Sequence, residues 1–133
     1  MSTIAQAPLR VLVIDDMQDI LTITSAILQS LGAEAFTATS AAVGLDILKQ
    51  QLAGGSTFNL VILDIRMPGT DGFSAAEQLR AAGYKGKMVA FTANATMQGK
   101  KKGVQAGIDG YFSKMVLNKD VLGALLDEVR RGS

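Results

Sequence analysis

The chain contains no cysteine and no histidine among its 133 residues. Without cysteine it cannot form disulfides, bind zinc through thiolates or use a thiol nucleophile. Without histidine it lacks the serine–histidine–acid triads, the histidine metal sites and the usual general base at neutral pH. Chemistry in this protein must therefore come from carboxylates, hydroxyls and lysines, or from a metal ion bound through oxygen.

An excess of charge of one sign is also absent, and so are long apolar runs. Thirteen basic residues face twelve acidic ones, which excludes an overall basic field for nucleic acid as the main feature. No run approaches the roughly 18 apolar residues of a membrane span, and residues 1–10 lack the features of a secretory signal. With 48% hydrophobic residues in 133, we expect one domain with a sizeable core. The balanced charge and the absence of long apolar runs lead us to expect a cytoplasmic protein with neither nucleic acid nor membrane as partner.

Short apolar runs alternate with amphipathic stretches of helical length along the chain. The apolar runs predict five strands, at residues 9–14, 33–38, 59–63, 88–91 and 108–112. Helical spacing predicts the helices between and after them, at about 20–31, 41–52, 73–82, 97–106 and 118–130, with Ser40 as the N-cap of the second. This pattern is typical of an α/β fold, a doubly wound five-stranded parallel sheet with five helices.

Polar residues stand where these strands end. Asp15 and Asp16 close the first strand, Asp64 the third and Thr92 the fourth, and Lys114 follows the fifth. Right-handed crossovers bring all these strand ends to one edge of the sheet, where such folds bind ligands. Three carboxylates there repel one another, which raises their pKa values and costs stability unless a cation is bound. A site with oxygen ligands alone favours Mg²⁺. A carboxylate beside Mg²⁺, a lysine and a hydroxyl suits in-line phosphoryl transfer onto aspartate.

The same residues lie in four ordered motifs. They are Val13-Ile14-Asp15-Asp16, Leu63-Asp64-Ile65-Arg66-Met67-Pro68-Gly69-Thr70-Asp71-Gly72, Thr92-Ala93 and Tyr111-Phe112-Ser113-Lys114. With this set the chain resembles a two-component response-regulator receiver domain over residues 9–131, after an N-terminal tail of residues 1–8. It is similar both to single-domain, chemotaxis-regulator-like receivers and to those of hybrid histidine kinases. The resemblance implies a flavodoxin-like fold with strand order 2-1-3-4-5.

The resemblance also implies a metal site. Asp64 would be the phosphoacceptor, and Asp16 and Asp64 would ligate Mg²⁺ directly. Asp15 would act largely through water, and the main-chain carbonyl of Arg66 would add a ligand. No other cofactor is implied.

Three further residues receive roles from the resemblance. Lys114 would pair with the phosphoryl group, Thr92 would hydrogen-bond it, and Tyr111 would be the aromatic residue whose position follows the state of Thr92. Met115 follows Lys114 where the family usually has proline after a cis peptide bond. Since a cis bond before a non-proline residue costs about 3–4 kcal/mol, we predict a trans peptide and a relocated loop here.

The implied function is a phosphorylation-dependent signalling switch. A phosphohistidine on a histidine kinase or a histidine phosphotransfer domain would supply the phosphoryl group. The chain has no histidine, so this donor must be another protein or a small phosphorylated molecule. The face of the fourth helix, fifth strand and fifth helix would then change its binding to a downstream protein. No catalysis is implied beyond self-catalysed phosphotransfer and dephosphorylation, and the sequence specifies no oligomeric state.

Three other functions remain open. A phosphate-monoester hydrolase of haloacid-dehalogenase type also uses an aspartyl phosphate with Mg²⁺, but Met17 stands in place of its second acid. A nucleotide- or flavin-binding module needs a glycine-rich loop after the first strand, where Asp16-Met17-Gln18 stands instead. A protein-binding pseudo-receiver that is never phosphorylated is favoured only by Met115.

The fourth predicted helix contains two glycines, Gly99 and Gly103, around the run Lys100-Lys101-Lys102. The lysines are interpreted as a solvated helix face. Each glycine costs about 1 kcal/mol relative to alanine in a helix interior. The glycines therefore predict a short or mobile helix, suited to a face that rearranges.

Overall fold

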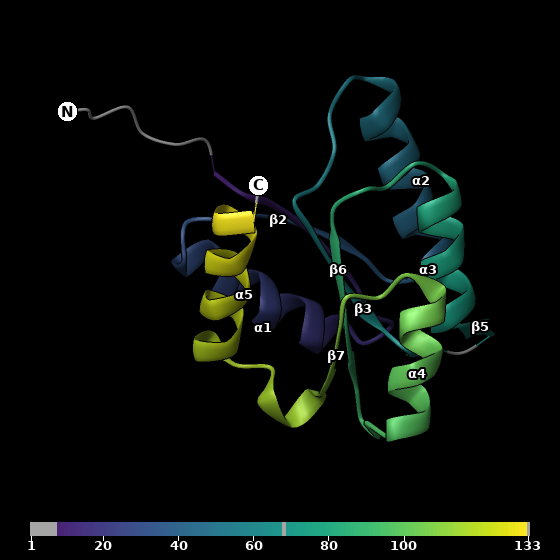
Figure 1. The fold of residues 1–133 in the computed structure, drawn as a ribbon. Coiled ribbons are helices and arrows are strands. Elements are labelled where there is room, and N and C mark those ends of the chain that lie inside the picture. The colour runs from purple at the N-terminus through teal and green to yellow at the C-terminus, as the bar shows by residue number, and fades with distance from the viewer. Residues whose placement is uncertain (1–7, 68, 133) are drawn as a thin grey trace.

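Five parallel strands form the central sheet of the computed structural model, which describes residues 8–67 and 69–132. The strands are β1 (Arg10–Ile14), β2 (Glu34–Ala38), β3 (Leu60–Asp64), β6 (Lys87–Thr92) and β7 (Gly110–Ser113), in the order β2-β1-β3-β6-β7 (Figure 1). Because β6 and β7 are the fourth and fifth sheet strands along the chain, the predicted order 2-1-3-4-5 is confirmed. Two short strands, β4 (Arg66–Met67) and β5 (Thr70–Asp71), pair antiparallel beside the sheet.

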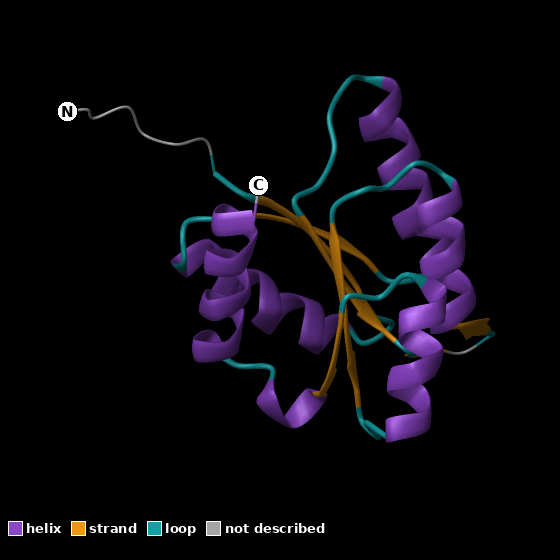
Figure 2. Cartoon of the chain, viewed as in Figure 1, coloured by secondary structure: helices purple, strands orange, loops and turns teal. Residues whose placement is uncertain are grey.

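Helices cover both faces of the sheet (Figures 1 and 2). One face carries α1 (Gln18–Ser30) and α5 (Lys119–Gly132), and the other carries α2 (Ala41–Ala53), α3 (Gly72–Ala81) and α4 (Met97–Ala106). A single 3₁₀ turn, η1 (Lys114–Val116), joins β7 to α5. None of the helices in the described part of the chain is long and apolar enough to span a membrane.

The core consists of two layers separated by the sheet. Side chains alternate along each strand, so Val11 and Val13 of β1 point to one layer and Leu12 and Ile14 to the other. The α1–α5 layer contains Val11, Val13, Leu21, Leu28, Leu60, Ile62, Val89, Phe91, Leu122, Leu125 and Leu126. The α2–α4 layer contains Leu12, Ile14, Leu48, Phe58, Val61, Leu63, Leu79, Tyr84, Met88, Ala106 and Ile108. Burial of the three central strands, β1, β3 and β6, on both faces explains their nearly unbroken apolar sequence.

Side-chain caps set the beginnings of several helices. The predicted N-cap Ser40 is confirmed, because its hydroxyl accepts a hydrogen bond from the Val43 amide at 3.2 Å. The Asn118 side chain accepts from the amide of Val121 at 3.0 Å, so α5 starts after Asn118. These bonds satisfy backbone amides that have no partner within the helix.

Two sequence expectations need correction. The predicted fifth strand begins at Gly110 rather than Ile108, because the Ile108 amide caps the end of α4 by donating a hydrogen bond to the Gly103 carbonyl at 2.8 Å. No strand is predicted between Asp64 and Gly72, but this segment contains the β4–β5 hairpin; Pro68 is outside the described residues. The predicted N-terminal tail, residues 1–8, is also outside them except for Pro8.

Arg80 connects three segments at the end of the sheet where β6 begins. Its guanidinium donates hydrogen bonds to the carbonyl oxygens of Gly107 at 3.0 and 2.8 Å, Tyr84 at 3.1 Å and Gly86 at 2.7 Å. A further bond at 3.0 Å joins it to the carboxylate of Asp109. The planar guanidinium thus holds the α3–β6 and α4–β7 loops together.

Candidate functional site

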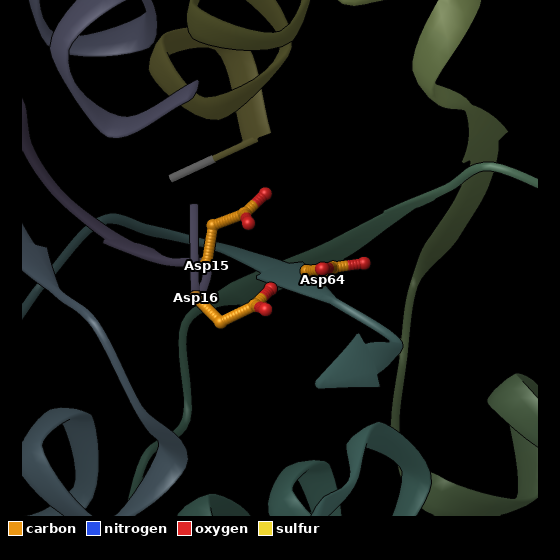
Figure 3. Close-up of side chains that lie close together, drawn as sticks. All are labelled: Asp15, Asp16 and Asp64. Atoms are coloured by element: carbon orange, nitrogen blue, oxygen red, sulfur yellow. The ribbon is translucent and has the colours of Figure 1, made fainter. Parts of the chain in front are cut away.

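Three aspartates lie together where two neighbouring central strands end. Asp15 and Asp16 directly follow β1, and Asp64 is the last residue of β3 (Figure 3). Each offers one carboxylate oxygen, and these oxygens all lie within 4.8 Å of one another. Asp15 and Asp64 are buried, whereas Asp16 is exposed. The cluster is therefore open to solvent on one side and enclosed on the other.

Backbone amides orient the two buried carboxylates. The Oδ1 atom of Asp15 accepts a hydrogen bond from the Met17 amide at 3.0 Å. The Oδ1 atom of Asp64 accepts one from the Arg66 amide at 3.2 Å. In each residue the second oxygen, Oδ2, is left for the shared pocket.

Lys114 bridges the two buried carboxylates. Its Nζ lies 3.1 Å from Oδ2 of Asp15 and 3.2 Å from Oδ2 of Asp64. The lysine begins η1, directly after β7. No cis peptide bond occurs among the described residues, so the predicted trans bond between Lys114 and Met115 is confirmed. Lys114 therefore reaches the pocket without the proline that usually follows it.

The charges in this pocket do not balance. Burial raises the pKa of Asp64, and the nearby charge of Asp15 raises it further, whereas Lys114 and the Arg66 amide lower it without reversing the rise. Burial lowers the pKa of Lys114, but its hydrogen bonds and ion pairs with Asp15 and Asp64 outweigh burial and raise it. Lys114 is thus held in its charged form, and one ammonium faces three carboxyl groups. The remaining negative charge favours binding of a cation.

Thr92 and Tyr111 lie on the strands beyond Asp64. Thr92 ends β6, one residue past the register partner of Asp64, and is 1% exposed. Tyr111, in β7, is half-buried, and its hydroxyl interacts with the Thr92 side chain. Burial raises the pKa of Tyr111, and Arg66 and Thr92 oppose that rise. The predicted tyrosine and threonine are therefore adjacent in the structure.

The structure brings most of the predicted site residues together. The three aspartates and Lys114 form one cluster, and the backbone of Arg66 is held beside Asp64 through its amide. Sequence reasoning missed Phe73, whose ring stacks on that of Tyr111 with centroids 6.3 Å apart. No local pattern marks this contact, because it joins the first turn of α3 to a distant strand.

Comparison with known proteins agrees with this arrangement. A family model described as response regulator receiver domain matches residues 11–126. The sensor protein GacS of Pseudomonas syringae pv. syringae is 30% identical over 127 residues, which cover 92% of this chain and 13% of GacS. The chain spans 7% to 14% of the length of four such curated relatives, so it matches one part of each.

Solved structures share the fold. The CheY-like receiver domain protein from Methanospirillum hungatei JF-1 has a TM-score of 0.82 and 28% identity, covering 94% of this chain and 96% of that one. The receiver domain of the histidine kinase CKI1 from Arabidopsis thaliana, complexed with Mg²⁺ and BeF₃⁻, has a TM-score of 0.78 and 24% identity, covering 92% and 89%. Because the family model matches most of the chain and the sheet order agrees, this chain belongs to the response regulator receiver domain family of two-component signalling systems.

Proposed function

We propose that this domain is a phosphorylation-dependent switch that accepts a phosphoryl group from a phosphohistidine onto Asp64 with Mg²⁺. The observation that carries the proposal is the position of Lys114, which contacts Asp15 and Asp64 at 3.1 and 3.2 Å. It places a fixed positive charge beside the carboxylate that would receive the phosphoryl group. Such preorganised charge is the main contribution a protein makes to phosphoryl transfer.

The acidic cluster fits a hard divalent cation. Its donors are carboxylate oxygens only, and all three lie within 4.8 Å of one another. Asp16 and Asp64 would hold Mg²⁺ directly, Asp15 through water, and the carbonyl of Arg66 would complete the protein ligands. When bound, Mg²⁺ neutralises negative charge on the phosphoryl oxygens. The receiver domain of CKI1, which was solved with Mg²⁺ and BeF₃⁻, supports this assignment.

The transfer would need the phosphohistidine donor and Mg²⁺ in addition to the side chains of the pocket. A carboxylate oxygen of Asp64 attacks phosphorus, and the bond between phosphorus and the imidazole nitrogen of the donor breaks. The electron pair leaves with the imidazole, and Asp64 becomes an acyl phosphate. Lys114 pairs with a phosphoryl oxygen, and the hydroxyl of Thr92 donates a hydrogen bond to another. Attack of water on phosphorus later releases inorganic phosphate and restores Asp64.

The partners follow from this chemistry. Residues 9–131 would act as the receiver, in the cytoplasm, and a histidine kinase or a histidine phosphotransfer domain would be the donor. Phosphorylation would favour one of two existing conformations of the face formed by α4, β7 and α5. A downstream protein would bind that face in one conformation better than in the other.

Intact mass spectrometry after incubation with Mg²⁺ and phosphoramidate tests the proposal. We expect the wild type to gain one phosphoryl group, and Asp64→Asn to gain none. Asp46→Asn removes an exposed carboxylate on α2 and is the matched control, which should be labelled like the wild type. Chelation of Mg²⁺ by EDTA should abolish labelling. Equal labelling of Asp64→Asn, or no adduct on any variant, would contradict the proposal, and the second result would favour a protein-binding pseudo-receiver.

A further inference from the structure

The two glycines of α4 differ in their relation to Tyr111. Both Gly99 and Gly103 lie on the buried face of the helix. A methyl group added at Gly99 would overlap the hydroxyl oxygen of Tyr111, approach its ring carbon Cζ to 2.9 Å and lie 3.1 Å from the hydroxyl oxygen of Thr96. One added at Gly103 would lie 3.5 Å from ring carbon Cδ1, which is an ordinary contact. The observed position of Tyr111 therefore requires glycine at 99 but not at 103.

Other contacts keep Tyr111 in this place. The ring of Phe73, in the first turn of α3, stacks on it at an interplanar angle of 15°. The Nζ atom of Lys102 lies 5.3 Å from the centre of the Phe73 ring. The Tyr111 hydroxyl interacts with Thr92. The phenol is thus enclosed by α3, by α4 and by the end of β6.

The backbone of Gly99 is itself held in place. Thr96 is the N-cap of α4, and its hydroxyl accepts a hydrogen bond from the Gly99 amide at 2.9 Å. Moving Gly99 away from Tyr111 would disturb this cap. The start of α4 is therefore held where the backbone of Gly99 faces the tyrosine hydroxyl.

We propose that Gly99 is the positioning residue of the switch. Because Gly99 has no side chain, the Tyr111 hydroxyl can lie against its backbone. The position of Tyr111 beside Thr92 and the position of the first turn of α4 therefore depend on each other. Any side chain at position 99 would force either the Tyr111 ring out of this position or α4 away from the sheet. As far as the response to phosphorylation is concerned, this inference rests on the proposed function.

Alanine substitutions in the unphosphorylated protein give the first test. Alanine is the better helix former, so Gly103→Ala, the matched control, should leave the urea midpoint of unfolding unchanged or raise it. Gly99→Ala should lower the midpoint and shift the NMR signals of the Tyr111 ring and the Thr92 amide, which Gly103→Ala leaves in place. In a Tyr111→Ala background, Gly99→Ala should lower the midpoint much less, because only the tighter contact with Thr96 remains.

Identical behaviour of the two glycine variants would overturn the inference. So would a Gly99→Ala loss that is equally large without the Tyr111 side chain, because the clash with Tyr111 would then not be its cause. An unshifted Thr92 amide in Gly99→Ala would reduce the role of Gly99 to local packing and would also refute it.

Phosphoramidate labelling provides the second test. Gly99→Ala should gain a phosphoryl group on Asp64, but the amide signals of α4 should not show the shift seen in the labelled wild type. A full α4 response in labelled Gly99→Ala would contradict the inference. Absence of labelling in the wild type would refute the proposed function alone, since the comparisons in the unphosphorylated protein still decide the role of Gly99.

Discussion

Replacing Asp64 by asparagine should stabilise the fold when no divalent cation is present. The Asp64 side chain is 3% exposed and lies in the same pocket as Asp15. Its pKa is raised by burial and by the charge of Asp15, so the folded state disfavours the ionised form. Asparagine has nearly the same shape and no charge, and it removes this cost.

The structure limits the size of the effect. Two unit charges no more than 4.8 Å apart repel by at least about 3 kcal/mol at an effective dielectric constant of about 20. Attraction to Lys114, 3.2 Å from Asp64, opposes this repulsion and is lost in the variant. The upward direction of the pKa shows that burial and repulsion together exceed the attraction. Because the attraction to Lys114 cancels part of the repulsion, we expect a gain of about 1–2 kcal/mol in the free energy of unfolding.

Urea unfolding followed by far-UV circular dichroism, in EDTA at neutral pH, measures this gain. The pKa of Asp64 is higher in the folded state than its value of 3.8 in the unfolded state. The wild type therefore has its full stability below pH 3.8 and loses stability as pH rises through the pKa of the folded state. The advantage of Asp64→Asn should therefore be complete at neutral pH and disappear in acid. Mg²⁺ should stabilise the wild type more than the variant.

Asp46→Asn, on the exposed face of α2, is the matched control and should change the free energy of unfolding by less than about 0.5 kcal/mol. A lower urea midpoint for Asp64→Asn in EDTA would refute the reasoning. An equal Mg²⁺ effect on wild type and variant would show that Asp64 does not bind the ion.

Three other substitutions have definite expected outcomes. Lys114→Met leaves two buried carboxylates without their cation, so it should lower the free energy of unfolding by about 2–3 kcal/mol in urea and slow phosphoramidate labelling. Arg80→Lys cannot reproduce the guanidinium bonds to Gly107 and Gly86 and should cost about 2 kcal/mol, whereas Lys85→Arg on the exposed loop should cost almost nothing. Burial raises the pKa of Tyr84 well above 10.0, so wild-type stability should fall as pH rises beyond 10.0. Tyr84→Phe, which loses a hydrogen bond to Lys87 worth about 1 kcal/mol, should reduce that fall in urea titrations.

The sheet and its order were predictable because buried parallel strands leave a strong signal. Residues 60–63 are apolar without interruption, and the polar residue that follows, Asp64, marks the strand end. The boundaries that failed depend on bonds that no local pattern encodes. Ile108 has the composition of a strand residue, yet its amide completes the end of α4. The β4–β5 hairpin was missed because its two-residue strands are too short to show alternation.

The positions of the site residues were predictable to the extent that each ends a strand. Asp15, Asp64 and Thr92 converge because parallel strands end at one edge. The bridging geometry of Lys114 was not predictable, since it depends on the path of η1. The role of Gly99 was not predictable either, because a glycine in a helix suggests flexibility unless the ring that it accommodates is known.

Adjacent residues of β7 belong to opposite layers of the core. Tyr111 packs against the α2–α4 layer and Phe112 against the α1–α5 layer, where its ring lies 5.3 Å from that of Phe91. The sheet therefore separates the layer packed against α2, α3 and α4 from the layer packed against α1 and α5. Through these two neighbouring side chains, β7 contacts both layers, so a shift of this strand would reach α4 on one face and α5 on the other. A displacement of this one strand would therefore reshape α4 and α5 together, which makes the two helices a single surface that one event can change.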